Sequence, residues 1–219
     1  MKAVIPVRKG SVRVKNKNLK SFAGKSLLEY KIEQLKRVDD IEEVIVNSDC
    51  ELMLNVAKKM GVSFKKRESF YASSEVSINL VWQDIAKNMD CETIIYVNAT
   101  SPMISDSTIK SCIKKYKEEG LFEKKQSLNT VTSIREFLWN KEGPINYDKN
   151  NQPRSQDLPL VYHPNFGVNI IDKETMYGEK TIITDRFFPF FIDKVESIDI
   201  DDELDFEIAE ILFTKRSIE

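Results

Sequence analysis

The sequence has few of the residues that build zinc-bound or disulfide-linked domains. It contains three cysteines and one histidine in 219 residues, and Cys50, Cys91 and Cys112 form neither a CxxC pair nor a cluster with the histidine. Structural zinc sites and disulfide frameworks depend on such spacings. The sequence therefore argues against both, and we expect three reduced thiols in a cytoplasmic protein.

The chain also lacks an excess of charge of one sign and any long apolar run. Lys and Arg number 33 and Asp and Glu number 35, which gives a formal net charge of −2. A general nucleic-acid binder carries a basic excess, and a membrane helix needs roughly 18 apolar residues. The apolar run at residues 3–7 is too short for the core of a signal peptide. We therefore expect no nucleic acid and no membrane among the partners.

Short apolar runs alternate with segments of helical periodicity along most of the chain. Strands are predicted over 3–7, 43–46, 62–64 and 93–97, and helices after residue 26 and over 51–60, 77–88, 107–118 and 203–214. Ser48 and Asp49 are expected to cap the second helix. This alternation predicts an α/β fold with a mainly parallel sheet covered by helices on both faces. A ligand should then bind at the carboxyl ends of the strands.

One region departs from this alternation. Between about residues 124 and 164 the sequence is rich in Gly, Pro, Asn and Asp, with isolated hydrophobic residues. We interpret it as an excursion of hairpins from the core. The chain is therefore predicted to be a single domain, 1–219, that carries an inserted segment at about 124–164.

The loop expected after the first strand concentrates positive charge. Five cations occur in ten residues, and Gly10, Ser11 and Asn18 lie among or beside them; the cations are Arg8, Lys9, Arg13, Lys15 and Lys17. Arg presents a planar fork of donors to phosphate, and a Gly-Ser pair lets backbone amides approach its oxygens. The loop has neither a GxGxxG turn nor a GxxxxGK[ST] motif. A polyphosphate site is the favoured interpretation, and a solvated basic loop is the alternative.

A pair of aspartates near the C-terminus is the second candidate. Asp199 and Asp201 alternate with isoleucines, so in an extended segment both carboxylates point to one face. One or two carboxylates, completed by waters and substrate phosphates, are a common way to bind Mg²⁺. The alternative is that Asp202 and Glu203 only cap the last helix and that Asp199 is a surface residue.

Several separated motifs resemble, in order, those of the CMP-sugar cytidylyltransferases, whose best-known members are the CMP-sialic acid synthetases. The resemblance extends from about residue 2 to 213. It is carried by IPVRKGS (5–11) with KNL (17–19) and GKSL (24–27), KR (66–67) with AS (72–73), TSP (100–102), PRSQDLP (153–159) with Asn165, and SIDID (197–201) with ELD (203–205).

The resemblance implies a role for each matching residue. It implies nucleotide binding by Arg8, Gly10, Ser11, Lys17, Asn18 and Arg67, with Arg8 and Lys17 on the CTP phosphates, Asn18 on the ribose or base side and Arg67 on the cytidine. It implies Mg²⁺ as cofactor on Asp199 and Asp201, so that the catalytic set is Arg8, Lys17, Asp199 and Asp201. It implies contacts to the sugar by Asn98, Thr100, Arg154 and Asn165, with Arg154 acting across the interface of a homodimer.

The implied reaction is transfer of CMP from CTP to the anomeric hydroxyl of a 2-keto sugar acid, with release of pyrophosphate. The acceptor side departs from the sialic acid enzymes. Where those commonly have QPTSPLR, this chain has NATSPMI at 98–104, so a glutamine is replaced by the shorter Asn98 and the arginine is absent. Alternatives are a cytidylyltransferase for an eight-carbon keto acid or a sugar phosphate, and a CTP-binding module without turnover.

Overall fold

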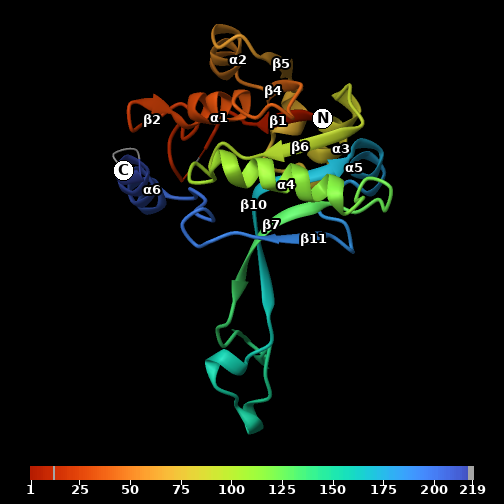
Figure 1. Ribbon diagram of the computed structural model, residues 1–219. Coiled ribbons are helices and arrows are strands. Elements are labelled where there is room, and N and C mark those ends of the chain that lie inside the picture. Colours follow the sequence, from red (N-terminus) through yellow and green to blue (C-terminus); the bar gives the residue numbers. More distant parts are fainter. Residues whose placement is uncertain (12, 217–219) are drawn as a thin grey trace.

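The computed structural model describes residues 1–11 and 13–216. A seven-stranded sheet forms the centre, in the order β11-β7-β10-β6-β1-β4-β5 (Figure 1). Its strands are β1 (Lys2–Pro6), β4 (Glu43–Ser48), β5 (Ser63–Lys66), β6 (Thr93–Val97), β7 (Leu128–Ile134), β10 (Val161–Asp172) and β11 (Phe188–Phe191). All pairings in this sheet are parallel except those of β10, which runs antiparallel to both β6 and β7. The predicted mainly parallel sheet is confirmed.

Helices cover both faces of the sheet, as the alternation predicted. The helices are α1 (Leu27–Lys36), α2 (Glu51–Lys59), α3 (Ile78–Asn88), α4 (Asp106–Glu118), α5 (Lys173–Glu179) and α6 (Glu203–Arg216). Side chains of β1 alternate between two apolar cores: Ala3 and Ile5 pack with α1, α2, α4 and α6, whereas Val4 packs with α3 and α5. Continuous apolar strands of this kind are typical of a sheet that is buried on both faces.

The start of α2 corrects one expectation about capping. Its N-cap is Cys50, which makes no side-chain cap bond. The hydroxyl of Ser48 accepts from the amide of Cys50 (3.1 Å). Asp49 instead accepts from the amide of Lys9 (2.9 Å), so its carboxylate ties the first basic residues of the loop after β1 to the end of β4. The carboxylate of Asp49 thus has its partner outside the helix and does not cap α2.

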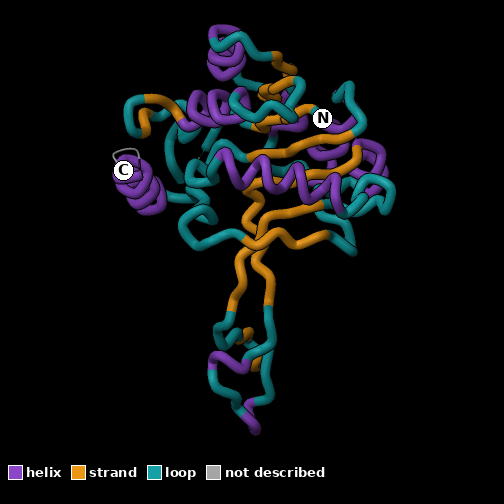
Figure 2. The backbone as a smooth tube through the Cα atoms, viewed as in Figure 1, coloured by secondary structure: helices purple, strands orange, loops and turns teal. Residues whose placement is uncertain are grey.

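Strands β7 and β10 continue beyond the sheet and carry an arm that projects from the body (Figures 1 and 2). The arm holds β8 (Trp139–Asn140) paired with β9 (Gly143–Pro144) and the short 3-10 helices η2 (Lys149–Asn151) and η3 (Ser155–Asp157). A further small ribbon, β2 (Ser21–Phe22) with β3 (Lys25–Ser26), precedes α1, and the 3-10 helix η1 (Ser69–Ala72) follows β5. Within the described part of the chain, no helix is long and apolar enough to cross a membrane.

Candidate functional site

A cavity of about 420 Å³ opens at the carboxyl ends of β1 and β6. Strand β4 pairs with one side of β1 and β6 with the other, so the strand order reverses at β1. The loops that leave two such strands diverge, and ligands of open α/β sheets bind in the crevice between them. The cavity is lined by Pro6, Val7, Arg8, Gly10, Ser11, Arg13, Val14, Lys17, Asn18, Asn98, Ala99, Thr100 and Asp201.

The loop after β1 is anchored to its neighbours through backbone atoms. The amide of Val7 donates to the carbonyl oxygen of Asn47 (3.0 Å), and Gly10 has a φ of 89°, a conformation that glycine adopts without strain. The guanidinium of Arg8 donates to the carbonyl oxygen of Ala72 at the end of η1 (3.0 Å). The structure thus places Arg8, Gly10 and Ser11 in the cavity wall.

Lys17 and Asn18 form the inner end of this loop. Lys17 is half-buried and its ammonium donates to the carbonyl oxygen of Ile200. Burial lowers the pKa of Lys17, whereas the carboxylates of Asp199 and Asp201 act in the opposite direction. Asn18 is buried, and its Oδ1 has no hydrogen-bond partner. Both residues line the cavity, and the buried amide oxygen of Asn18 is left unsatisfied.

Of the two predicted aspartates, Asp201 lines the same cavity and Asp199 does not. They lie outside the sheet, between β11 and α6, where the amide of the buried Ile200 donates to the carbonyl oxygen of Thr100 (2.9 Å). Asp201 is exposed and pairs with Arg13 (2.8 Å). Asp199 is more enclosed; burial raises its pKa, and its Oδ1 is buried without a partner.

The capping alternative accounts for Asp202 but not for Asp199. Asp202 accepts from the amide of Asp205 (3.0 Å), and the carboxylate of Asp205 accepts in return from the amides of Asp202 (3.1 Å) and Asp201 (2.9 Å). This reciprocal arrangement fixes the start of α6. Asp199 takes no part in it. The side chain of Thr100 is its hydrogen-bond partner, and only Oδ1 is left without one.

These carboxylates suit a magnesium ion whose other ligands come from a substrate and from water. Among residues 1–11 and 13–216, no three or more His, Cys, Asp or Glu side chains form a group that could hold a metal. A closed structural site is therefore absent from this part of the chain. Asp199 has a buried oxygen without a partner, and Asp201 lines the cavity. Two carboxylates completed by phosphate oxygens and waters suit Mg²⁺.

Arg67 lies outside the cavity lining but is buried. Its Nε donates to Oδ1 of Asn47 (2.6 Å) and its Nη2 to the carbonyl oxygen of Asn47 (3.2 Å). No carboxylate forms an ion pair with it in the part of the chain that the structure covers. Burial consequently lowers the pKa of Arg67. Asn47 is a residue that the sequence analysis missed, because nothing in a buried strand marks one asparagine as the support of a distant arginine.

The residues expected on the sugar side are divided among three places. Asn98 and Thr100 line the cavity, whereas Asn165 is buried in β10. Arg154 stands on the arm, where it is exposed and pairs with Asp157 (2.7 Å). Because the arm projects away from the body (Figure 1), the structure does not bring Arg154 to the cavity of its own chain.

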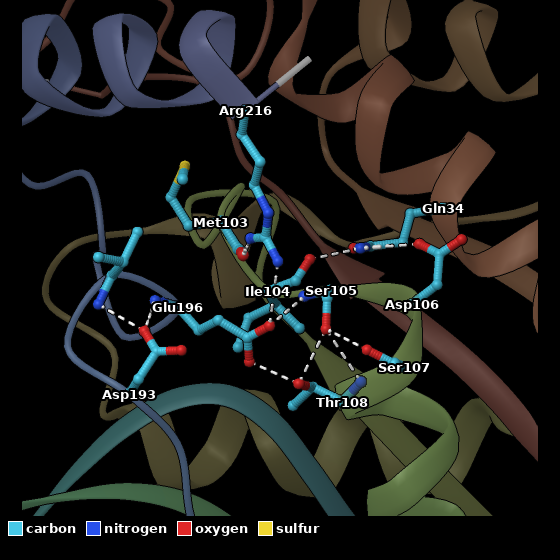
Figure 3. A network of polar contacts seen from close by, with 11 residues as sticks. Gln34, Met103, Ile104, Ser105, Asp106, Ser107, Thr108, Asp193, Glu196 and Arg216 are labelled. Carbon is cyan, nitrogen blue, oxygen red and sulfur yellow. Dashed lines mark hydrogen bonds and ion pairs between the residues drawn. The ribbon is translucent and has the colours of Figure 1, made fainter. Parts of the chain in front are cut away.

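Backbone oxygens of the loop after β6 are held by side chains from distant elements (Figure 3). From α1, Lys31 donates to the oxygen of Ser101 (3.0 Å) and Gln34 to that of Ile104 (2.6 Å). From the end of α6, Arg216 donates to the oxygen of Met103 (2.8 Å). These bonds fix the loop that carries Asn98 and Thr100.

A buried carboxylate, that of Glu196, is bonded to the end of the same loop (Figure 3). Glu196 accepts from the amide of Ser105 (3.1 Å) and from the hydroxyl of Thr108 (2.5 Å), both at the start of α4. Its own amide donates to Asp193 (2.9 Å), and Arg216 lies 3.6 Å from the carboxylate. The sequence analysis missed this network. Its one local signal was the position of Lys31 and Gln34 on the apolar face of α1.

Relatives of this chain include named enzymes. The N-acylneuraminate cytidylyltransferase of Escherichia coli O18:K1:H7 is 27% identical over 98% of this chain, and the pseudaminic acid cytidylyltransferase of Campylobacter jejuni strain 81-176 is 27% identical over 96% of it. This chain spans about half (52%) of the first protein and 94% of the second. The CMP-N,N'-diacetyllegionaminic acid synthase of Legionella pneumophila is 25% identical, with 96% of this chain and 94% of that protein covered.

Solved structures share the fold. A CMP:2-keto-3-deoxy-manno-octonic acid synthetase complexed with CTP superimposes with a TM-score of 0.73 at 14% identity, over 98% of both chains. The 4-diphosphocytidyl-2C-methyl-D-erythritol synthase of Anaerococcus prevotii gives 0.69 at 16% identity, over 97% of this chain and 95% of that one. The sequence profile of the family described as "Cytidylyltransferase" matches residues 2–212. The profile covers almost the whole chain, and the protein therefore belongs to the cytidylyltransferase family.

Proposed function

We propose that this protein transfers CMP from CTP to the anomeric hydroxyl of a 2-keto sugar acid and releases pyrophosphate. The observation that carries the proposal is the cavity at the β1/β6 crevice, whose lining includes the cations Arg8, Arg13 and Lys17 and the carboxylate Asp201. Family membership and relatives named for N-acylneuraminate, pseudaminic acid and diacetyllegionaminic acid support the same reaction.

The nucleotide half of the site follows from the loop after β1. Arg8 and Lys17 are assigned to the CTP phosphates, with the backbone of Gly10 and Ser11 beside them and Asn18 toward the ribose or base. A cation about 4 Å from a phosphate interacts by roughly 4 kcal/mol at an effective dielectric near 20, before desolvation. Arg8 and Lys17 thus stabilise the leaving pyrophosphate. Attack on the α-phosphorus needs this neutralisation more than it needs a nucleophilic side chain.

Arg67 is assigned to the cytidine. Its guanidinium is oriented by Asn47 from two directions, and this leaves donors that Asn47 does not use. Desolvation lowers its pKa, yet an arginine remains charged at neutral pH. A buried cation without a carboxylate partner is expensive unless a ligand supplies acceptors. The carbonyl oxygen of a pyrimidine base is such an acceptor.

Asp199 and Asp201 would hold Mg²⁺. The ion, when bound, withdraws charge from the phosphate oxygens and makes the α-phosphorus a better electrophile. Asp201 must exchange its partner for this, because its carboxylate contacts Arg13 in the structure (2.8 Å). Both side chains of that pair are exposed, so the exchange costs little. Arg13 is then free to turn to the phosphates.

The sugar acid is assigned to Asn98, Thr100 and Asn165, with Arg154 supplied by a second subunit. A homodimer is part of this proposal, because Arg154 stands on the projecting arm and cannot reach the cavity of its own chain without a large movement (Figure 1). Sedimentation at micromolar concentration should give twice the mass of the chain. A fully active monomer would contradict a role for Arg154 across an interface. A cytoplasmic location, where three free thiols persist, completes the proposal.

The reaction is tested by pyrophosphate release from CTP and Mg²⁺ with a panel of acceptors: sialic, pseudaminic and legionaminic acids, an eight-carbon keto acid and a sugar phosphate. ATP, GTP and UTP serve as nucleotide controls. Release with CTP and one of the nine-carbon acids supports the proposal. Release with only the eight-carbon acid or the sugar phosphate would replace the acceptor, and CTP binding without any release would indicate a nucleotide-binding module.

A matched pair of lysine variants tests the site. Lys17→Met removes a cation that lines the cavity, whereas Lys15→Met removes an exposed cation of the same loop that does not line it. We expect Lys17→Met to lower pyrophosphate release by about 100-fold or more, and Lys15→Met to change it by less than about threefold. Equal effects of the two changes would mean that the loop acts only through its overall charge.

A further inference from the structure

Asn165 occupies an irregular point of β10, an inner strand, at the end of the sheet where the cavity lies. Strand β10 pairs antiparallel with β6 from Val168, which is opposite Val97. Asn165 therefore lies near the carboxyl end of β6, from which Asn98 leads into the cavity. The pairing of β10 with β7 shifts register between Pro164 and Asn169, and Phe166 takes a left-handed φ of 56°. Bulges of this kind redirect side chains next to active sites.

The hydrogen bonds around Asn165 determine which way its amide points. The amide N–H of Gly167 lies 3.1 Å from one terminal atom of the side chain. A backbone N–H can only donate, so this atom must be the oxygen, Oδ1.

Thr130 of β7 fixes the same atom from the other side. Its hydroxyl accepts from the amide of Val168 (3.0 Å) and donates to Oδ1 of Asn165 (2.7 Å). The carbonyl oxygen of Val168 is a more distant acceptor for the same proton (3.3 Å). The hydrogen bonds thus run from the amide of Val168 to the hydroxyl of Thr130 and from there to Oδ1 of Asn165. The amide of Gly167 donates to the same oxygen. Thr130 is fully buried, so water does not compete for these bonds.

The other end of the Asn165 amide is left without a partner. Its Nδ2 is buried and makes no hydrogen bond. The residue as a whole is 7% exposed. An unsatisfied buried donor is costly and needs an explanation. The loop after β6 is close by, because a Cβ on Gly167 would lie 2.8 Å from Cδ1 of Ile104 and 3.2 Å from Oδ1 of Asn165. The side chain of Asn165 therefore lies near the loop that carries Asn98 and Thr100.

We infer that Thr130 is a positioning residue of the acceptor site: it locks the Asn165 amide so that Nδ2 donates to a carboxylate or hydroxyl oxygen of the acceptor. The inference rests on the proposed function for the presence of an acceptor there. It adds the direction of the contact, since a group that can only donate hydrogen bonds cannot satisfy Nδ2. A sugar acid, which presents a carboxylate and several hydroxyls, offers the required oxygen.

Asn165→Asp separates this role from a structural one. The variant keeps an oxygen that accepts from both Thr130 and Gly167, and it replaces the Nδ2 donor by a second carboxylate oxygen. We expect the KM for the acceptor to rise by about 10- to 100-fold, while the KM for CTP stays within about twofold. A purely structural role would instead appear as a loss of stability from the buried carboxylate and as equal changes in the two KM values. An unchanged KM for the acceptor would therefore overturn the inference.

Thr130 is tested with a conservative pair of variants and a neighbour. Thr130→Val removes the hydroxyl at nearly constant volume, and Thr130→Ser restores it. We expect the first to raise the KM for the acceptor by about 3- to 30-fold and the second to return it to within about twofold of the wild type. Thr132→Val, a buried threonine two residues along the same strand, is the control and should leave both KM values within about twofold. Equal effects of the valine changes at positions 130 and 132 would overturn the positioning role.

Failure of this inference can be distinguished from failure of the proposed function. Normal turnover in the wild type with unchanged acceptor kinetics in Asn165→Asp overturns the inference alone. If the wild type releases no pyrophosphate with any acid, the proposed reaction fails, and binding of sialic and pseudaminic acids to the CTP-loaded protein is measured by calorimetry instead. Binding that Asn165→Asp weakens by about tenfold or more would keep the acceptor site, and no binding at all would overturn both.

Discussion

Lys31 is a deeply buried cation that supports the loop after β6. Its burial should make the free energy of unfolding depend on pH. It is 2% exposed, and its ammonium donates only to uncharged oxygens, those of Gln34 (2.6 Å) and Ser101 (3.0 Å). Burial, opposed by the more distant carboxylates of Asp106 and Glu196, lowers the pKa of Lys31 from an ordinary 10.5 to about 7.

The sign of the effect follows from the two pKa values. Between pH 7 and 10.5 the unfolded chain carries a proton on Lys31 that the folded protein has largely lost. The unfolded state then binds more protons, so the free energy of unfolding increases with pH, with a slope approaching about 1.4 kcal/mol per unit. Because the folded group is half protonated near pH 7, the gain from pH 7 to 9 is about 2 kcal/mol. The gain levels off above the unfolded pKa.

The assay compares wild type with Lys31→Met by urea denaturation at pH 7, 8 and 9. Methionine fills a similar volume without titrating, so the difference in free energy of unfolding between the two proteins should change by about 2 kcal/mol over this range. Lys110→Met, which removes an exposed lysine of α4, is the control and should run parallel to the wild type. Parallel profiles for Lys31→Met as well would refute the reasoning and mean that the ammonium stays charged in the fold.

Three further outcomes are expected. Asp201→Ala should change the free energy of unfolding by less than about 1 kcal/mol, because its pair with Arg13 is exposed. It should nevertheless lower pyrophosphate release at limiting Mg²⁺ by at least about tenfold. Near-normal release would remove Asp201 as a ligand. Glu196→Ala should lower the free energy of unfolding in urea by about 3 kcal/mol and Glu196→Gln, which keeps one side-chain oxygen, by about 1 kcal/mol. Equal losses would mean that the hydrogen bonds accepted by Glu196 are unimportant for stability. Burial raises the pKa of Cys112, so this thiol should react with a disulfide reagent only after unfolding; labelling of the native protein at Cys112 would contradict its placement.

Much of the fold could be predicted because its signals are local. The apolar runs of β1, β4 and β6 and the helical spacing of α1, α4 and α6 depend on neighbouring residues, and each appears in the structure within a few positions of its expected bounds. The start of α2 is an exception because the contact that decides it is not local. Asp49 was expected to serve its own helix, but a loop 40 residues earlier in the chain supplies the donor that it takes.

The sequence alone determined which residues could carry the chemistry, since the cations after β1 and the alternating Asp199 and Asp201 stand out by composition and spacing. Only the tertiary structure decided how they are supported. Arg13 and Asp201 are 188 residues apart, and Thr130 and Asn165 are 35 apart. Such contacts depend on the strand order and on the bulge in β10, which place distant segments side by side. No local pattern encodes that placement, because hydrophobic periodicity fixes which face of a strand is buried but not which polar partner it will meet there.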